Sequence, residues 1–449
     1  MYAKNYLNVE YFTRLVNFRQ QIRECFLKRR EAVCSLLDAV KQSSHLNSFV
    51  ELSLAPCFKH RWESVYAAIE DSQIDVEKLN RRCLEQVPRR EQLYFALDVM
   101  NVRRASSETL KERVICHGAK REAFGNGIVY GLPYSLLAFC ENANSSWAMT
   151  VNSERVKPEE KAVAVAVAQI QWLFENIGAD SEVSVGLDGG YGNLSFFSQM
   201  RGKKGFAVAR MRTDRVLYRK PEEPNGRRGR DPKYGTKFKF NEPATWGEAE
   251  EILEFADEKH GQVRLEKWSG LRFRVAGEVV EIEVVRSQIR LERKKRPPAK
   301  WYGIHNGGGE PSELKRCYLA AKHRWTIEGA NRFKKERLYA EKPKFRRAES
   351  SDKWLRITQV LEWEIYLWKE LAKDEKMPWQ KPLSGEKLTP GRVLRSLANN
   401  LSEVAEPLKE VLPRGKSSGW EKGRKRSRPQ KYKIELKGKK KASKREKIE

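Results

Sequence analysis

Long apolar runs are missing from this sequence. No stretch of 18 consecutive apolar residues occurs in its 449 residues, so no segment is predicted to form a membrane-spanning helix. The first residues, MYAKNYLNVEYFTRL, carry no basic start followed by an apolar stretch, and no secretory signal peptide is expected. These two absences predict a cytoplasmic protein.

Paired metal-binding cysteines are missing as well. The seven cysteines are scattered, no CxxC pair occurs, and the six histidines do not stand at zinc-like spacing from them. This pattern excludes zinc fingers and predicts reduced, mostly buried thiols.

Acidic residues are outnumbered, and the excess of basic residues is concentrated. The chain has 88 Lys and Arg against 60 Asp and Glu, a net charge of +28. Residues 201–240 hold 14 basic and 4 acidic residues, and residues 415–449 hold 15 and 4. Such an excess predicts a polyanionic partner. Neither segment shows a regular apolar face, so nucleic acid is favoured over a membrane surface. A merely solubilising role would explain the C-terminal segment better than the internal one.

The apolar pattern predicts an α/β fold between helical parts. Short apolar runs predict strands, and an Ala- and Val-rich stretch predicts a helix packed on their sheet; the strands are expected at 93–98, 127–140, 147–151, 183–188 and 206–210, and the helix at 162–174. Further helices are predicted over 245–260, 312–338, 353–371 and 390–408, and alternating strands over 262–292.

These elements divide the chain into six predicted regions. They are a helical, DNA-binding module at 1–90, the first part of a mixed-sheet core at 91–212, a β-rich insertion at 213–310, the last part of the core at 311–372, a C-terminal helical region at 373–414 and a disordered basic tail at 415–449.

Three acids stand at positions that suggest chemistry. Asp98 and Asp188 each follow a buried strand, and parallel neighbouring strands would bring both carboxylates to one sheet edge. Glu328 lies on the predicted helix 312–338, where Arg324 and Lys335 are spaced to share its face, while Trp325 and Ile327 are expected to pack on the core. Converging carboxylates need a cation, and Mg²⁺ prefers carboxylate oxygens and binds phosphates. Two such ions activate a nucleophile in phosphodiester chemistry.

Each acid also has a simpler interpretation. An aspartate at a strand end is often a turn former or a helix cap. Glu328 with Arg324 and Lys335 is also compatible with plain ion pairing on a helix surface. Taken singly, each acid favours the simpler interpretation; the combination with a basic chain makes a metal site an equal alternative.

The segments around the acids carry a family resemblance. ALDVMNV holds Asp98, VGLDGGYGN holds Asp188 and, through a D-x-x-Y pattern, Tyr191, and RWTIEGANRFKK holds Glu328. They resemble bacterial insertion-sequence transposases with a DDE triad on a ribonuclease-H-like core, in the group with a β-strand insertion before the last acid. HGAKREAFGNGIVYGLPYSLL and GRRGRDPKYG also resemble parts of that core, so the resemblance covers about residues 90–370.

One position departs from the family pattern. The Tyr–Arg–Glu–Lys signature of the family matches Arg324, Glu328 and Lys335, but its tyrosine position falls on Ala321, and Tyr318 lies one turn early. In the family an aromatic residue of the insertion receives a flipped base. Trp301 and Trp268 lie in that region, and core packing is the favoured interpretation for both.

The resemblance implies a DDE transposase. Asp98, Asp188 and Glu328 would be catalytic and bind Mg²⁺ or Mn²⁺, and Arg324, Lys335 and Tyr191 would contact DNA. The implied partners are double-stranded DNA, as terminal inverted repeats and as target, and a second copy of the chain in a homodimeric DNA complex. The implied location is the bacterial cytoplasm, at the nucleoid when the protein is bound to DNA.

Three other functions remain open on the sequence. The first alternative is a catalytically inactive, transposase-derived DNA-binding protein, and the second is a ribonuclease-H-like nuclease or resolvase. An RNA-binding protein is the weakest, because no aromatic motif of the RRM type occurs.

Overall fold

The computed structural model describes residues 2–117, 127–178, 180–222, 232–259, 261–275, 277–290, 298–307, 313–384, 387–404, 423 and 428–436. Parts of the segments singled out in the sequence lie outside these ranges, namely 118–126, most of the basic Gly-rich stretch GRRGRDPKYG, and most of the tail 415–449. None of the helices in the described ranges is both long and apolar enough to cross a membrane.

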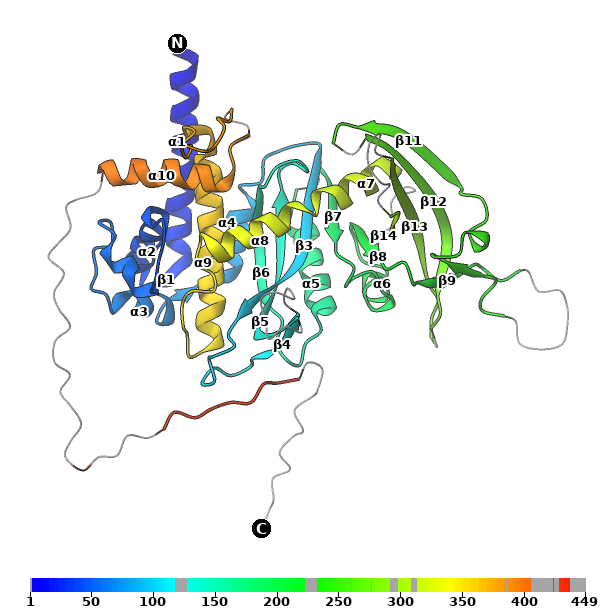
Figure 1. Cartoon of the computed structure of the whole chain (residues 1–449), viewed down its shortest axis with the longest axis horizontal. Helices are drawn as coiled ribbons and strands as arrows, with labels where there is room; N and C mark the ends of the chain where they lie inside the picture. The colour runs from blue at the N-terminus through cyan, green and yellow to red at the C-terminus, as the bar shows by residue number, and fades with distance from the viewer. Residues whose placement is uncertain are drawn as a thin grey trace.

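A mixed sheet forms the body of the described molecule (Figure 1). Its strands lie in the spatial order β10-β9-β12-β13-β14-β8-β7-β3-β5-β4, with β6 beside β5 and β11 beside β12. Their bounds are β3 Gln92–Arg103, β4 Val114–His117, β5 Ile128–Cys140, β6 Ala148–Arg155, β7 Glu182–Leu187, β8 Phe206–Met211, β9 Val216–Tyr218, β10 Lys237–Lys239, β11 Glu251–Asp257, β12 Gly261–Phe273, β13 Val280–Arg290 and β14 Lys300–Asn306. The predicted α/β class is confirmed.

Helices cover the sheet and build a separate layer beside it. The helices are α1 Tyr2–Cys25, α2 Arg30–Gln42, α3 Ser64–Glu70, α4 Val76–Leu84, α5 Ala162–Asn176, α6 Leu194–Met200, α7 Leu314–His323, α8 Thr326–Glu336, α9 Ala348–Trp368 and α10 Pro390–Val404. Short 3₁₀ turns span Phe49–Leu54, Pro243–Thr245 and Lys369–Leu371, and a two-stranded sheet joins β1 Phe26–Lys28 to β2 Gln73–Ile74.

Helices α5 and α8 pack on opposite faces of the central strands. On α5, Gln169 bonds Ser135 of β5, whereas Asn331 of α8 bonds Asp98 of β3. In the β3–β5 register Asp98 lies opposite Leu136, the neighbour of Ser135. Because successive side chains of a strand point to opposite faces, Ser135 and Asp98 belong to different faces.

The β-rich region extends the same sheet. β14 pairs antiparallel with β8, and β13 and β12 continue outward, which confirms the alternating strands expected over 262–292. Trp268 and Trp301 are both buried there, in a cluster with Phe238, Phe240 and Trp246. Core packing is therefore the role that the structure shows for both tryptophans.

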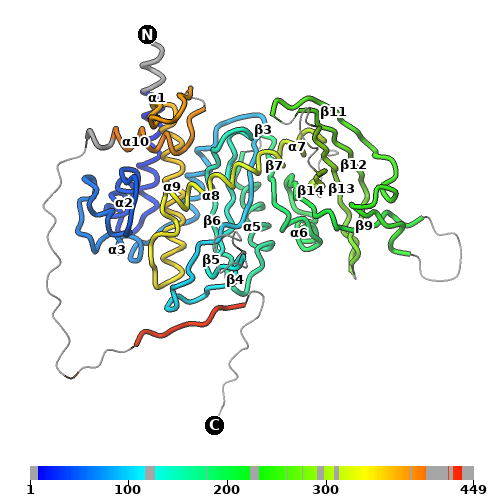
Figure 2. The backbone as a smooth tube through the Cα atoms, viewed as in Figure 1, coloured from blue at the N-terminus to red at the C-terminus, as the bar shows by residue number. Residues whose placement is uncertain are grey.

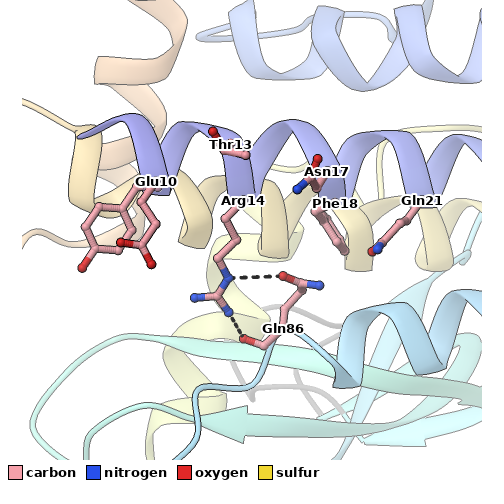
Figure 3. A pocket seen from close by; sticks show the side chains of 8 residues that line it. Glu10, Thr13, Arg14, Asn17, Phe18, Gln21 and Gln86 are labelled. Atoms are coloured by element: carbon pink, nitrogen blue, oxygen red, sulfur yellow. Dashed lines mark hydrogen bonds between the residues drawn. The ribbon is translucent and has the colours of Figure 1, made fainter. Parts of the chain in front are cut away.

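The N-terminal helices and α9 form the second layer. Helix α9 contacts β6 on one side and α1 on the other, and the two helices run side by side in Figures 1 and 2. A groove of about 490 Å³ follows α1, where Arg14 donates hydrogen bonds to the side chain and backbone of Gln86 (Figure 3). The helical character expected for residues 1–90 is confirmed apart from the short β1–β2 pair.

Two expected helices differ from the structure. Residues 245–260 do not form a helix: a 3₁₀ turn at Pro243–Thr245 precedes strand β11. Its charged side chains are paired across the sheet, as Arg264 of β12 shows by bonding Glu254, while Phe255 packs against Tyr318. The helix predicted over 312–338 is two helices, α7 and α8, which meet at Arg324 and Trp325.

Part of the basic tail is attached to the sheet. Residues 428–436 run along Glu108–Val114, with a parallel bridge between Val114 and Glu435. The Tyr432 N–H donates to the Glu108 carbonyl at 2.8 Å, and the Arg113 guanidinium donates to the Tyr432 carbonyl at 3.1 Å. The expectation of a wholly disordered tail is wrong for these residues, because backbone pairing at a free sheet edge stabilises an extended segment. We call residues 428–436 the strap.

Candidate active site

Asp98 and Asp188 lie next to each other on parallel strands. The β3–β7 register pairs Leu97 with Leu187, so the two aspartates occupy the next position on each strand. Asp188 follows β7 directly, as predicted, but Asp98 is not a strand end, because β3 continues to Arg103 along β5. The two aspartates are therefore adjacent because of the register of β3 and β7, and not because both strands end there.

The surroundings of Asp98 disfavour its charge. Asp98 is half-buried under α8, and its Oδ2 accepts a hydrogen bond from the Asn331 side chain at 3.1 Å. Loss of hydration raises the pKa of Asp98 to about 6, and the charges of Asp188 and Glu328 act in the same direction, against Arg324. The three carboxylates and Arg324 therefore share one electrostatic environment.

A tight turn orients Asp188. Its Oδ1 accepts the Gly190 N–H at 2.9 Å, and Asn193 caps α6 by accepting the Phe196 N–H. At Gly192 an added Cβ would lie 2.1 Å from the Arg210 carbonyl oxygen. Glycine is thus required where this turn passes against β8.

Glu328 lies in the first turn of α8 and is paired with Arg324. The Arg324 Nη2 donates to Glu328 Oε1 at 2.8 Å, with 8% of the arginine side chain and 47% of the glutamate side chain exposed. Arg324 lies at the end of α7, which approaches β7 so closely that a Cβ at Gly186 would meet the Ala320 carbonyl at 2.5 Å. The predicted proximity of the two residues holds across a helix junction instead of along one helix.

The other predicted DNA contacts are less open to solvent than expected. Lys335 pairs with Glu341 at 3.6 Å. Tyr191 is 3% exposed and packs edge to face against Phe196, so in this structure its ring supports the turn after β7. Tyr318 is also buried and does not replace the missing family tyrosine at Ala321.

Trp325 contradicts the expectation that it packs on the core. Its side chain is 47% exposed, with Arg324 at 4.7 Å and Lys300 at 5.4 Å from the ring centroid. These residues and Arg210 line one small pocket, and burial together with the charges of Arg210 and Arg324 lowers the pKa of Lys300. We call Arg210, Lys300, Arg324 and Trp325 the cationic cluster.

Comparison with known proteins identifies the family. Residues 21–272, more than half of the chain, match the family of DDE superfamily endonucleases. The chain belongs to this family. No curated protein matches it. Among solved structures it is similar to piggyBac transposase, determined by cryo-EM as a synaptic complex with hairpin DNA, at 9% identity and a TM-score of 0.40 over 87% of this chain and 76% of that chain.

The family match includes Asp98 and Asp188 and ends before Glu328. For this endonuclease-family chain, the third acid rests on the geometry around α8. The donor chemistry fits Mg²⁺ or Mn²⁺, since all three side chains offer carboxylate oxygens and the two aspartates occupy adjacent positions on paired strands. Within the described ranges, however, no three His, Cys, Asp or Glu side chains are already arranged to hold a metal ion.

The structure adds one polar residue that the sequence analysis missed. Asn331 stands three residues after Glu328, hence on the same side of α8, and bonds Asp98 directly. The i, i+3 spacing was the available signal. An asparagine in a helix carries no chemistry by itself, and the contact with β3 depends on tertiary packing.

Proposed function

We propose that this protein is a DNA transposase that cuts the ends of a mobile element and joins the freed 3′ hydroxyl to target DNA. The observation that carries the proposal is the register of β3 and β7, which sets Asp98 beside Asp188 in a chain of the DDE superfamily endonucleases. Glu328, which raises the pKa of Asp98 together with Asp188, is the proposed third acid.

The sheet order supports a ribonuclease-H-like core. The central strands run β6-β5-β3-β7-β8, with β3, β7 and β8 parallel and β5 antiparallel to β3. In this interpretation residues 91–212 and 311–372 form the core, 213–310 is the insertion, 1–90 is the DNA-binding module, and 373–414 is the C-terminal helical region.

Asp98, Asp188 and Glu328 would hold the divalent cations. When bound, Mg²⁺ or Mn²⁺ supplies an activated water and neutralises charge on the phosphate that is attacked. The chain contributes fixed carboxylate positions: Asn331 holds one oxygen of Asp98, and the Gly190 N–H holds one oxygen of Asp188. In each case the second oxygen is the one proposed for the ion.

The cationic cluster supports DNA as the partner. Arg324, which pairs with Glu328, lies with Arg210 and Lys300 around an exposed indole ring, and cations next to an aromatic face suit phosphates and bases. Lys335 and Tyr191 remain proposed DNA contacts, Tyr191 only after a movement that exposes it. A homodimer on two element ends, in the bacterial cytoplasm at the nucleoid, completes the proposal.

Cleavage of end DNA tests the function. Asp188→Asn and Glu328→Gln should each abolish cleavage with Mg²⁺ or Mn²⁺, while DNA binding stays largely intact because neither substitution removes a cation. Glu336→Gln, at an exposed position of the same helix, is the matched control and should cleave normally. Full cleavage by Asp188→Asn or Glu328→Gln would exclude that residue as a metal ligand.

One observation favours a second candidate, a DNA-binding protein without catalysis. Arg324 already pairs with Glu328, so this carboxylate has a cationic partner before any metal ion binds. This candidate predicts end-specific DNA binding by the native protein with no cleavage at any divalent-ion concentration. The same assay therefore separates the two functions.

A further inference from the structure

A buried ion pair anchors the helix that carries Glu328. The Lys334 Nζ of α8 lies 3.1 Å from Glu362 Oε2 of α9, with 1% and 4% of the two side chains exposed. Lys334 also donates to the Thr150 hydroxyl of β6 at 2.7 Å, and the Thr150 N–H donates to the same Glu362 oxygen at 3.2 Å. The three residues tie α8, α9 and β6 together at one point.

Elsewhere α8 contacts the sheet mainly through small apolar side chains. Ile327 and Ala330 of α8 meet side chains that are nearly all small; these are Ala96, Ala138, Cys140 and Ala148. Small side chains form shallow ridges, so they restrict the rotation of a helix about its axis less than interlocking side chains do. The directional bonds from Lys334, like the bond from Asn331 to Asp98, therefore restrain this rotation where the small side chains do not.

A need for stability alone does not explain the pair. Taking two charges out of water costs about as much as their attraction returns, and apolar replacements of similar volume are often neutral or stabilising. The buried Glu362 Oε1 makes no hydrogen bond, which adds to this cost. What such a pair supplies is one defined geometry between the elements that it joins.

We propose that Lys334 and Glu362 are positioning residues that set the rotation of α8 and thereby hold Glu328 towards Asp98. Asn331 bonds Asp98, and Glu328 lies three residues before it on the same side of α8, so a rotation of the helix would move both residues together. This inference rests on the proposed function, because it assigns to the pair the placement of a metal ligand.

The chain contains a matched control on the same helix. Glu364 of α9 pairs with Lys41 of α2, and the exposed fractions of 2% and 1% are as low as in the first pair. The positions of Glu362 and Glu364 differ by two residues, so the side chains leave α9 on nearly opposite sides. Lys41 thus forms a buried ion pair with α9 on the side away from Glu362, in a network that also includes Asp38 and Arg19.

The experiment compares Lys334→Met, Lys41→Met and the double variant Lys334→Met/Glu362→Leu. The double variant removes both charges, so it avoids the unpaired buried glutamate that destabilises Lys334→Met. Each protein is measured for melting temperature, for Mn²⁺ affinity by electron paramagnetic resonance, and for kcat and KM of end cleavage.

We expect the double variant to melt near the native temperature and yet to bind Mn²⁺ about 10-fold more weakly, the lower end of the loss seen when a group that orients a metal ligand is removed. Its kcat should fall while KM for DNA stays native. Lys41→Met should lose thermal stability but keep native Mn²⁺ affinity and kcat in the folded fraction.

Native Mn²⁺ affinity and native kcat in the double variant would overturn the inference and leave the proposed function standing. A native protein that neither cleaves end DNA nor binds Mn²⁺ in a manner sensitive to Asp188→Asn would overturn the proposed function, and the inference with it.

Discussion

Asp98 illustrates how a residue can be poorly placed for stability and well placed for chemistry. Its hydration is reduced and two other carboxylates act on it, so its charged form is disfavoured until a cation arrives. A metal ion would reverse this by favouring the charged form. The raised pKa of Asp98 should therefore be measurable in the metal-free protein as a pH dependence of its stability.

The first prediction concerns this signature. In the native state the pKa of Asp98 is raised to about 6, above its ordinary value, so between about pH 4 and 6 the native state binds more protons than the unfolded state. The free energy of unfolding must then fall as the pH rises through this window. Asp98→Asn should remove the fall and stabilise the protein by on the order of 2 kcal/mol at pH 7.5.

The measurement is urea denaturation in EDTA at several pH values between 4 and 7.5. Glu336→Gln serves as the control, because it removes an exposed carboxylate from α8. Mn²⁺ should then stabilise the native protein and not Asp98→Asn. If the free energy of unfolding varied with pH in the same way in the native and Asp98→Asn proteins, the pKa of this carboxylate would not be raised in the native state.

The second prediction concerns the proposed phosphate contacts. Arg324→Ala and Lys335→Ala should weaken DNA binding or strand transfer more than they weaken folding, because both cations are proposed phosphate contacts, Arg324 beside Glu328 and Lys335 near the end of the same helix α8. Melting temperature and strand transfer per folded molecule are measured together. A lower melting temperature with normal strand transfer would leave both residues as surface ion pairs.

At the scale of elements, the sequence was most informative where the apolar residues follow a single spacing along the chain. The runs around Leu93 and Val183 predicted β3 and β7, and the alternation from Val263 to Val284 predicted β12 and β13. Residues 245–260 misled because charged and apolar residues there satisfy a helical period as well. Pairing with β12 makes this segment a strand, and such pairing between strands cannot be seen in the local sequence.

The candidate site was predictable to a similar degree. The acids were found through residue type and position. The break between α7 and α8 was not found, because Arg324 and Trp325 both keep helical backbone angles and nothing in the local sequence marks an interruption. Trp325 stands at that break, and its exposed ring lies beside Lys300 of β14. Asn331 and Lys334 escaped notice because their partners are distant in the chain.

The third prediction concerns the exposed ring of Trp325. Stacking of a base on an aromatic ring contributes about 1–3 kcal/mol, so Trp325→Ala should weaken binding of end DNA with unpaired terminal bases about 5-fold or more. Trp379→Ala is the control, as that ring is 80% exposed on another part of the molecule. Trp268→Phe should change little because its ring is buried. Equal affinities for Trp325→Ala and Trp379→Ala would exclude stacking at Trp325.

At the scale of the whole molecule, charge and architecture meet in the C-terminal tail. Residues 415–449 carry 15 of the 88 basic residues, yet the strap within them pairs with the sheet edge at β4. In the strap Lys431 pairs with Glu108, whereas Tyr432 packs under Lys111. The strap therefore links a strongly basic segment to the sheet that carries Asp98, and its attachment and its charge are separable by mutation.

The last prediction separates them. Each neutralised phosphate releases counterions, so if roughly five tail cations touch DNA, truncation to residues 1–414 should flatten the slope of log K against log salt by about four to five units. Discrimination between end DNA and random DNA should change little, because phosphate contacts position the protein without reading sequence. Tyr432→Pro keeps every cation but removes the N–H that donates to Glu108, so it weakens the attachment of the strap without changing charge. It should keep a native or steeper slope, since Lys431 is released from Glu108.

The measurement is a salt titration of the native protein, the 1–414 truncation and Tyr432→Pro on specific and random duplexes. An unchanged slope in the truncated protein would show that the tail does not engage DNA, leaving solubility or a protein partner as its role.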